Sequence, residues 1–284
     1  MEAFPRGKVC SNDHGEFIAI EKRVACSGAG PGWAGIPGAH ERIAANLRLV
    51  HGIGPVTEAR LKNEGYLSVY MLTEHERWCD GARCAIEWIE NRDWSSLLSR
   101  RASDVGLLGM CNPENTVFLD IETTGLSATA PLFMVGMLIP DDDGLRLCQL
   151  FARNYDEETA VLDETVKLLA DAQAVVTFNG RSFDVPFIRR RLAYYGRDDA
   201  FEGLVVDLLS HARRRFRSEL PDCRLATIQT TILSTPRCDD IPGELIPQVY
   251  QTFVRTGDAE LVLPIIDHNE WDLVAMADLL PLLV

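Results

Sequence analysis

The chain has 284 residues, of which 46% are hydrophobic and 25% charged, a composition that excludes a disordered or fibrous protein. No apolar run reaches the roughly 18 residues of a membrane-spanning helix, and the first residues lack the apolar core of a signal peptide; we therefore expect a cytoplasmic protein with no membrane partner. The net charge of −14 excludes a generally basic nucleic-acid surface.

The first 38 residues show little periodic pattern. Five glycines and two prolines fall within residues 27–39, and both residue types interrupt helices and strands. The sequence therefore predicts a flexible tail or linker over residues 1–38.

Residues 39–104 predict a small all-helical module. Apolar residues from Ile43 to Val50 recur at helical spacing, and Pro55 suits the first turn of a new helix. Between them lies a break that resembles a helix-hairpin-helix element, in which Gly52 and Gly54 let backbone N–H groups approach a phosphate. DNA binding and a purely structural role both stay open for this element.

Residues 115–284 predict an α/β domain. Short apolar runs indicate strands and longer amphipathic runs indicate helices. The expected strands are residues 116–121, 133–139, 145–151, 174–178 and 205–207, and the expected helices are 156–172, 185–195, 208–216 and a last one starting near residue 268. This order predicts a mixed sheet that opens with antiparallel strands and is flanked by helices.

Two acidic side chains project together from the first of these strands. Asp120 and Glu122 are two residues apart, so they point to the same face of a strand that is otherwise apolar. Burying two like charges is costly unless a partner neutralises them. A divalent metal ion is such a partner.

Further acidic residues follow at two later positions. Asp184 lies between the strand 174–178 and the next helix, where it could cap the helix or reach a metal at the carboxyl edge of the sheet. His268 and Asp272 are four residues apart and share one face of a helix. Four carboxylates and an imidazole suit phosphodiester hydrolysis with two divalent ions, and hard Mg2+ or Mn2+ prefers carboxylate oxygen.

The motifs 120–125, 179–184 and 268–272, in this order, closely resemble the three exonuclease motifs of the DEDD (DnaQ-like) superfamily. The resemblance spans about residues 116–284 and is best with the YprB-like branch of ribonuclease H-like exonucleases, related to proofreading domains of family B DNA polymerases. Segments 207–214 and 240–247 fit that branch as well. The resemblance implies a ribonuclease H-like fold and a metal-dependent 3′→5′ exonuclease.

Residue roles follow from this resemblance. Asp120 would bridge both ions and Glu122 would bind the ion that holds the nucleophilic water. Asp184 would support the second ion and Asp272 would complete the first. His268 would be the general base or would orient the water; three residues lie between it and the last aspartate, a spacing that resembles tyrosine-type members rather than histidine-type members.

Nucleic acid is the expected partner, DNA before RNA. Thr123, Asn179 and Phe183 lie within the motifs and are expected to contact it, with core packing as the alternative for Phe183. The arginine runs 189–191 and 213–217 are expected to contact the phosphate backbone or to form ordinary surface ion pairs. An endonuclease of the same fold and a non-catalytic nucleic-acid-binding scaffold stay as alternative functions.

Overall fold

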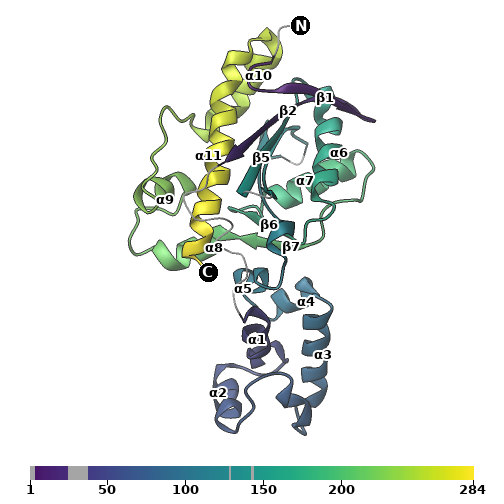
Figure 1. Ribbon diagram of the computed structural model, residues 1–284, viewed down its shortest axis with the longest axis vertical. Helices are drawn as coiled ribbons and strands as arrows, with labels where there is room; N and C mark the ends of the chain where they lie inside the picture. The colour runs from purple at the N-terminus through teal and green to yellow at the C-terminus, as the bar shows by residue number, and fades with distance from the viewer. Residues whose placement is uncertain (1–3, 25–37, 128, 142–143) are drawn as a thin grey trace. The chain divides into compact units, whose positions relative to one another are not determined.

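The computed structural model describes residues 4–24, 38–127, 129–141 and 144–284. The chain forms two compact units, one of Met1–Gly32 with Pro113–Leu283 and one of Trp33–Asn112 (Figure 1). Among the described residues, no helix combines the length and the apolar character needed to cross a bilayer.

The larger unit is built on one mixed sheet of seven strands in the described residues. The strands are β1 (Lys8–Asn12), β2 (Gly15–Val24), β3 (Thr116–Thr123), β4 (Leu132–Asp141), β5 (Gly144–Phe151), β6 (Ala174–Thr177) and β7 (Leu204–Asp207). Their order is β1-β2-β5-β4-β3-β6-β7. The pairs β1–β2, β2–β5, β5–β4 and β4–β3 are antiparallel, whereas the pairs β3–β6 and β6–β7 are parallel. The α/β fold with a mixed sheet is thus confirmed.

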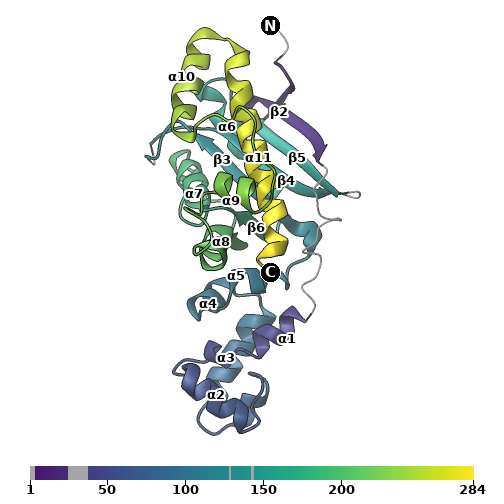
Figure 2. The same ribbon diagram turned by 90° about the vertical axis from the view of Figure 1, so that its left-hand side faces the viewer.

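Helices cover both faces of this sheet (Figure 1). The crossover helices α6 (Glu158–Leu169) and α7 (Asp184–Tyr194) lie on one face, because both connect parallel strands in the same direction along the sheet. The long helix α11 (Leu263–Leu279) packs against β3 and β4 on the other face, and Figure 2 shows it passing across the sheet. The remaining helices of the unit are α8 (Leu208–Phe216), α9 (Leu225–Thr231) and α10 (Ile246–Thr256).

Aromatic packing fastens α10 to the sheet. Tyr250 is fully buried and stacks on Phe133 with ring centroids 3.8 Å apart. Its hydroxyl donates to the carbonyl of Ala152 at 2.9 Å, so the polar atom is satisfied inside the core.

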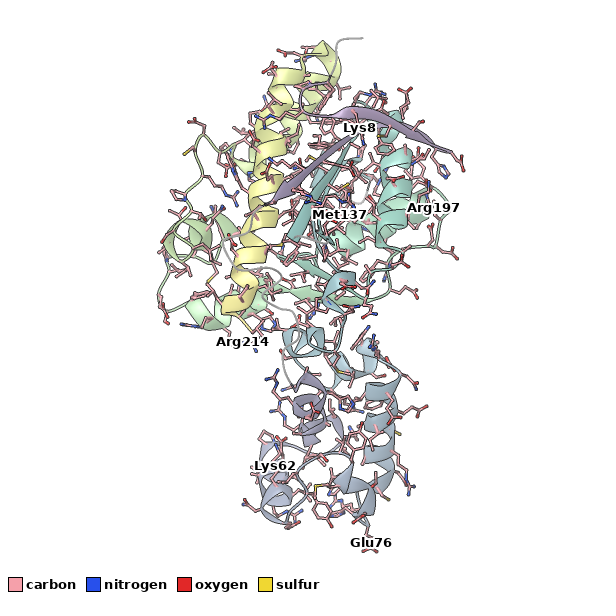
Figure 3. All side chains as sticks on the ribbon, viewed as in Figure 1. Lys8, Lys62, Glu76, Met137, Arg197 and Arg214 are labelled. Atoms are coloured by element: carbon pink, nitrogen blue, oxygen red, sulfur yellow. The ribbon has the colours of Figure 1, made fainter. Side chains whose placement is uncertain are left out.

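Figure 3 shows all described side chains. Met137 is buried within the sheet, while Arg214 is exposed at the surface.

Residues 8–24 depart from the sequence expectation, because they form β1 and β2 rather than a tail or linker. The buried run Phe17–Ile20 belongs to β2, which pairs antiparallel with β5. Because β5 lies more than a hundred residues further along the chain, no local sequence pattern predicts this pairing. The glycine-rich residues 25–37 lie outside the described residues.

The smaller unit consists of helices and turns, with no strand in residues 38–112. The helices are α1 (Ala39–Ala44), α2 (Pro55–Asn63), α3 (Cys79–Glu90), α4 (Trp94–Ser99) and α5 (Asp104–Leu108). Fully buried leucines, among them Leu47, Leu61 and Leu97, form its core. Between α1 and α2 the chain turns at Gly52, whose φ of 86° is open to glycine but costly for other residues.

Candidate active site

The strand β3 presents two acids on the face that α11 covers. Asp120 and Glu122 are both half-buried and alternate with the buried apolar residues of the strand. The register of β3 with β4 shifts between Glu122 and Thr123. Such an irregularity ends regular pairing and re-aims side chains, and it is common next to active sites.

Asp184 reaches back from α7 to the same strand. Its side chain is 5% exposed, and its Oδ1 accepts a hydrogen bond from the backbone N–H of Ile121 at 3.1 Å. Asp184 is the first residue of α7, and no side-chain cap is present at this helix start. The carboxylate is therefore directed to β3, between the positions of Asp120 and Glu122, rather than used as a helix cap.

The helix α11 contributes Asp272 and His268 from the middle of its length. It begins at Leu263, five residues before the start that the sequence pattern indicates. Asp272 forms an ion pair with Arg237, and its Oδ2 lies 3.5 Å from Nε2 of His268. The Nδ1 of His268 is 2.6 Å from Oδ1 of Asp240.

The carboxylates repel one another. Burial, followed by the charges of Asp272, Glu122 and Asp184, raises the pKa of Asp120 well above its usual range. The pKa of Glu122 is raised for the same kind of reasons, with burial again the largest. Burial raises the pKa of Asp184 to about 7, although the hydrogen bond from Ile121 acts against the shift. A group of like charges of this kind needs cations to ionise fully at neutral pH.

The donor set fits hard divalent cations, since carboxylate oxygen is the ligand that Mg2+ and Mn2+ prefer. As the side chains stand, however, no three His, Cys, Asp or Glu residues of the described chain converge closely enough to hold an ion. Asp272 is turned to Arg237 and Asp184 to the N–H of Ile121. The chemistry of the donors and their mutual repulsion fit a metal, and the two-ion arrangement stays a prediction.

Arg237 and Asp240 complete the site. Arg237 was not expected from the sequence, and Asp240 begins the segment 240–247 that resembles the YprB-like branch but was not assigned to the site. The side chain of Arg237 is 5% exposed; its Nη1 donates to Asp240 at 3.0 Å and its Nε donates to Oε1 of Gln229 at 2.6 Å. Both residues lie in the irregular segment between α9 and α10, which carries no periodic signal. An arginine and an aspartate three residues apart in such a segment are too common to indicate a site.

The three residues expected to contact nucleic acid differ in their surroundings. Thr123 is buried and its Oγ1 donates to the carbonyl of Gly125 at 2.9 Å. Asn179 is exposed, has a φ of 71°, and its N–H donates to Oδ1 of Asp207 at 2.8 Å. Phe183 is half-buried and packs on Phe187 at 5.4 Å between ring centroids, in line with the core-packing alternative.

Comparison with known proteins agrees with this architecture. Residues 117–284 match the model of the RNase H superfamily, and the chain belongs to this superfamily. Over 177 residues the chain is 29% identical to the uncharacterized protein YprB of Bacillus subtilis (strain 168), a match that covers 59% of this chain and 41% of the relative. The chain thus spans less than half the length of that relative. Among solved structures, the family B DNA polymerase of the archaeon Pyrobaculum calidifontis aligns at 18% identity with a TM-score of 0.47, over 58% of this chain and 24% of the polymerase.

Proposed function

We propose that the chain is a metal-dependent 3′→5′ exonuclease of the DEDD type, which hydrolyses nucleic-acid phosphodiester bonds with two Mg2+ or Mn2+ ions. The observation that carries the proposal is the set of mutually repelling carboxylates: Asp120 and Glu122 on β3 and Asp184 on α7, with Asp272 on α11 acting on all three. Membership of the RNase H superfamily supports a nuclease. The 3′→5′ direction rests on the motif resemblance.

These four carboxylates would hold the two ions, with Asp120 serving both. When bound, such ions stabilise the charge on the attacking and leaving oxygens and lower the pKa of a bound water. The protein itself supplies the positions: β3 fixes two donors on one face, and the N–H of Ile121 holds Asp184 beside them. Asp184 is buried, whereas Asp120 and Glu122 are half-buried, so the ions would be open to solvent and substrate on one side.

His268 would take the proton from the attacking water. Asp240 can only accept a hydrogen bond when ionised, so the 2.6 Å contact requires the proton of the imidazole to be on Nδ1. Nε2 is then left as the basic nitrogen, and it is the one that faces Asp272. A base oriented by a neighbouring carboxylate is a recurring arrangement in general-base catalysis.

In addition to the nuclease activity, the helix-hairpin-helix-like element would bind the DNA backbone. The turn Gly52–Gly54 opens onto a cavity of about 260 Å³ lined by Arg48, Arg100 and Arg101, at the N-terminus of α2. Backbone N–H groups and arginines together favour a phosphate. We expect the R48Q/R101Q variant to bind duplex DNA more weakly than the wild type in a gel-shift titration; equal binding would leave the element a structural role.

The activity is tested with 5′-labelled single-stranded DNA and RNA oligonucleotides in Mg2+ or Mn2+, with Asp120→Ala as the control. A metal-dependent ladder that shortens from the 3′ end is the expected result, with DNA degraded faster than RNA. Internal cuts would instead favour an endonuclease of the same fold. Binding without any cleavage would favour a nucleic-acid-binding scaffold.

A further inference from the structure

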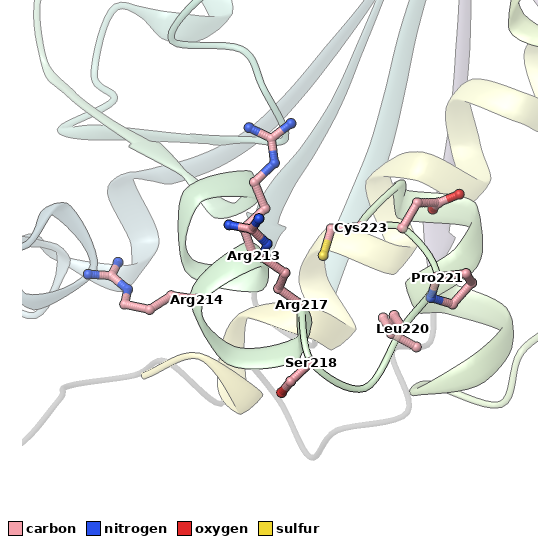
Figure 4. A pocket seen from close by; sticks show the side chains of 8 residues that line it. Arg213, Arg214, Arg217, Ser218, Leu220, Pro221 and Cys223 are labelled. Atoms are coloured by element: carbon pink, nitrogen blue, oxygen red, sulfur yellow. The ribbon is translucent and has the colours of Figure 1, made fainter.

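A groove runs along α8 from the end of β6. Two adjoining cavities, of about 980 Å³ and 500 Å³, share Arg213, Asp222 and Cys223 in their walls. The larger one extends to Arg217 (Figure 4). The smaller one extends to Asn179, so the groove connects the far end of α8 with the motif that carries Asp184.

The arginines in this groove are unlike their neighbours. Arg213 and Arg217 are exposed, stand one helical turn apart, and have no carboxylate within ion-pair distance among the described residues. By contrast, Arg215 pairs with Glu219 at 3.0 Å. Arg214 also lines the larger cavity, but it contacts His211 and points away from the other two (Figure 4). Two unpaired arginines stand out because residues from 116 onward contain 27 acidic and 15 basic residues, a net charge of −12.

The groove is also linked to the carboxylates. Asn179 lines the smaller cavity, its N–H donates to Oδ1 of Asp207 at 2.8 Å, and the same motif 179–184 ends at Asp184. One end of the groove therefore lies beside the motif of Asp184, and the other end carries the positive charges of Arg213 and Arg217. Asp222 in the shared wall lies 4.0 Å from Arg224, so its charge is partly balanced.

We propose that this groove holds the sugar–phosphate backbone of a single nucleic-acid strand whose 3′ end lies at the carboxylates, with Arg213 and Arg217 on neighbouring phosphates. The proposal rests on the proposed function. Side chains four residues apart on a helix have Cβ atoms about 5–6 Å apart, which lets both guanidinium groups follow one strand. The arginines would therefore act on strands of several nucleotides and not on the scissile bond.

The test neutralises the two arginines in an Asp120→Asn background, which allows binding to be measured without hydrolysis. The R213Q/R217Q variant is compared with K167Q/R255Q, which removes the same charge from exposed basic residues of α6 and α10 that lie outside the groove. Fluorescence anisotropy of a labelled (dT)20 strand is recorded at several salt concentrations. Two lost phosphate contacts reduce the slope of log K against log salt by about 1.4, and we expect this loss only in R213Q/R217Q.

A second substrate separates this proposal from the proposed function. The p-nitrophenyl ester of thymidine 5′-monophosphate occupies only the catalytic centre, so R213Q/R217Q with Asp120 intact should hydrolyse it at the wild-type rate while its KM for long strands rises. If the wild type is an active nuclease and R213Q/R217Q leaves the salt slope unchanged, the groove does not bind the strand and the proposal is overturned. A reduced slope in a protein that hydrolyses neither substrate keeps the groove and overturns the nuclease. A protein that binds no strand overturns both.

A different observation carries a second inference, about a buried amide on α11. Asn269 is fully buried, and its Nδ2 donates to Oδ2 of Asp120 at 2.8 Å. Its Oδ1 accepts from Nε2 of Gln149 at 3.0 Å, and the same Nε2 donates to the carbonyl of Ile266 at 2.9 Å. The orientation of the Asn269 amide is thus fixed, because its oxygen must face Gln149 and its NH2 must face Asp120.

The sheet is shaped to receive this amide. Asp120, Gly136 and Gln149 are direct cross-strand neighbours on β3, β4 and β5. Because cross-strand neighbours share a face, the missing side chain of Gly136 leaves a gap between the other two. A Cβ atom at Gly136 would overlap with the amide of Asn269, so glycine is required here for space rather than for its backbone angles.

We infer that Asn269 is a positioning residue for Asp120. By holding Oδ2 it sets the plane of the carboxylate and leaves Oδ1 for the metal ions, while Gln149 and Gly136 set the position of the amide itself. Groups that orient a metal ligand change metal affinity by about 10–100-fold when they are removed. This inference also rests on the proposed function, because it assigns Asp120 to a metal.

Mn2+ titration by calorimetry, without nucleic acid, tests this inference. We expect Asn269→Leu, which keeps the size but removes the amide, to weaken Mn2+ binding by about 10–100-fold. Gln149→Met and Gly136→Ala should change it in the same direction. Thr165→Val is the matched control, since it removes a buried hydrogen bond to Val161 on the helix that covers the other face.

The outcomes are distinguishable because unfolding in chelator is measured for every variant. Weaker Mn2+ binding with a melting temperature equal to that of Thr165→Val supports positioning of Asp120. Unchanged Mn2+ affinity in a destabilised Asn269→Leu protein makes the amide purely structural and overturns the inference. If Asn269→Leu does not fold, Gln149→Met decides by the same criterion. A wild type that binds no Mn2+ overturns the proposed function itself.

Discussion

The two sides of the carboxylate site differ in how their charges are balanced. On the side of β3 and α7, burial is the largest cause that raises the pKa of Asp120, Glu122 and Asp184, and the charge of Asp272 raises all three further. On the side of α11, Asp272 pairs with Arg237, and Asp240 contacts both Arg237 and His268. Among the described residues, no cationic side chain pairs with the acids of the first side, which is where we propose that metal ions bind. The acids of the second side are already held by Arg237 and His268.

The largest expected effect comes from the unbalanced side. Asp120→Asn keeps the shape of the residue but removes the charge that both ions would share, so we expect nuclease activity to fall by about 10³-fold or more, equivalent to ~4 kcal/mol of transition-state stabilisation. Digestion of labelled single strands in Mn2+ measures the loss. Circular dichroism of the variant controls for folding, and a folded variant with near wild-type activity would remove Asp120 from the site.

The balanced side should give a smaller loss. A general base contributes roughly 10²–10⁴-fold. We expect His268→Gln to reduce kcat by about 10²-fold, at the lower end of that range, with little change in Mn2+ affinity. Asp240→Asn should reduce kcat less, because Nε2 of His268 is retained and only its orientation is loosened. The pH profile of kcat decides the role: if His268→Gln leaves both kcat and the acidic limb of the profile unchanged, His268 is not the base.

Arg237 belongs to the side of α11 and should affect stability more than chemistry. Replacing it with methionine leaves Asp272 and Asp240 without their cation, and a hydrogen bond to a charged group contributes about 1.5–3 kcal/mol. We expect Arg237→Met to lower the melting temperature in chelator. Saturating Mn2+ should restore more of the loss than it adds to the wild type, because the metal then takes the place of the guanidinium at Asp272.

The matched comparison is Arg191, which pairs with Glu158 on the face of the sheet away from α11. Arg191→Met should destabilise the protein as well, but Mn2+ should return none of that loss. If Mn2+ stabilises both variants equally, Arg237 has no special relation to the metal-binding carboxylates.

The difference between the sides also explains what the sequence could predict. Asp120 and Glu122 were recognisable because a strand has a period of two, so the pattern alone places both acids on one face. The position of Asp184 followed from the strand–helix order. These inferences needed only neighbouring residues. In the structure Asp120 and Glu122 lie on one strand, and Asp184 accepts a hydrogen bond from Ile121 between them.

The remaining parts of the site and fold depend on contacts between residues that are far apart in the sequence. Arg237 and Asp240 lie in an irregular segment, and their contacts with α11 depend on how that segment folds back. Asn269 looks like an ordinary helix residue, and its contact with Asp120 requires the gap at Gly136 on a different element. In the same way β2 was missed because its partner is β5, far along the chain. No local period encodes any of these contacts.

The smallest expected effect is a pH dependence of stability on the unbalanced side. In the metal-free protein the pKa of Asp184 is raised to about 7, above its usual value of 3.8, so between these pH values the folded protein binds a proton that the unfolded chain has lost. Stability therefore falls as the pH rises through this window.

Asp184→Asn removes the titration, and it should raise the melting temperature in chelator at pH 8 relative to the wild type. This advantage should shrink towards pH 4 as the wild-type carboxyl becomes protonated. Thermal unfolding at several pH values measures this difference, and Glu202→Gln, a change at an exposed acid, should show none. Were the advantage of Asp184→Asn to grow towards pH 4, the carboxylate would be stabilised by its surroundings rather than by an incoming cation, and the contrast between the two sides would fail.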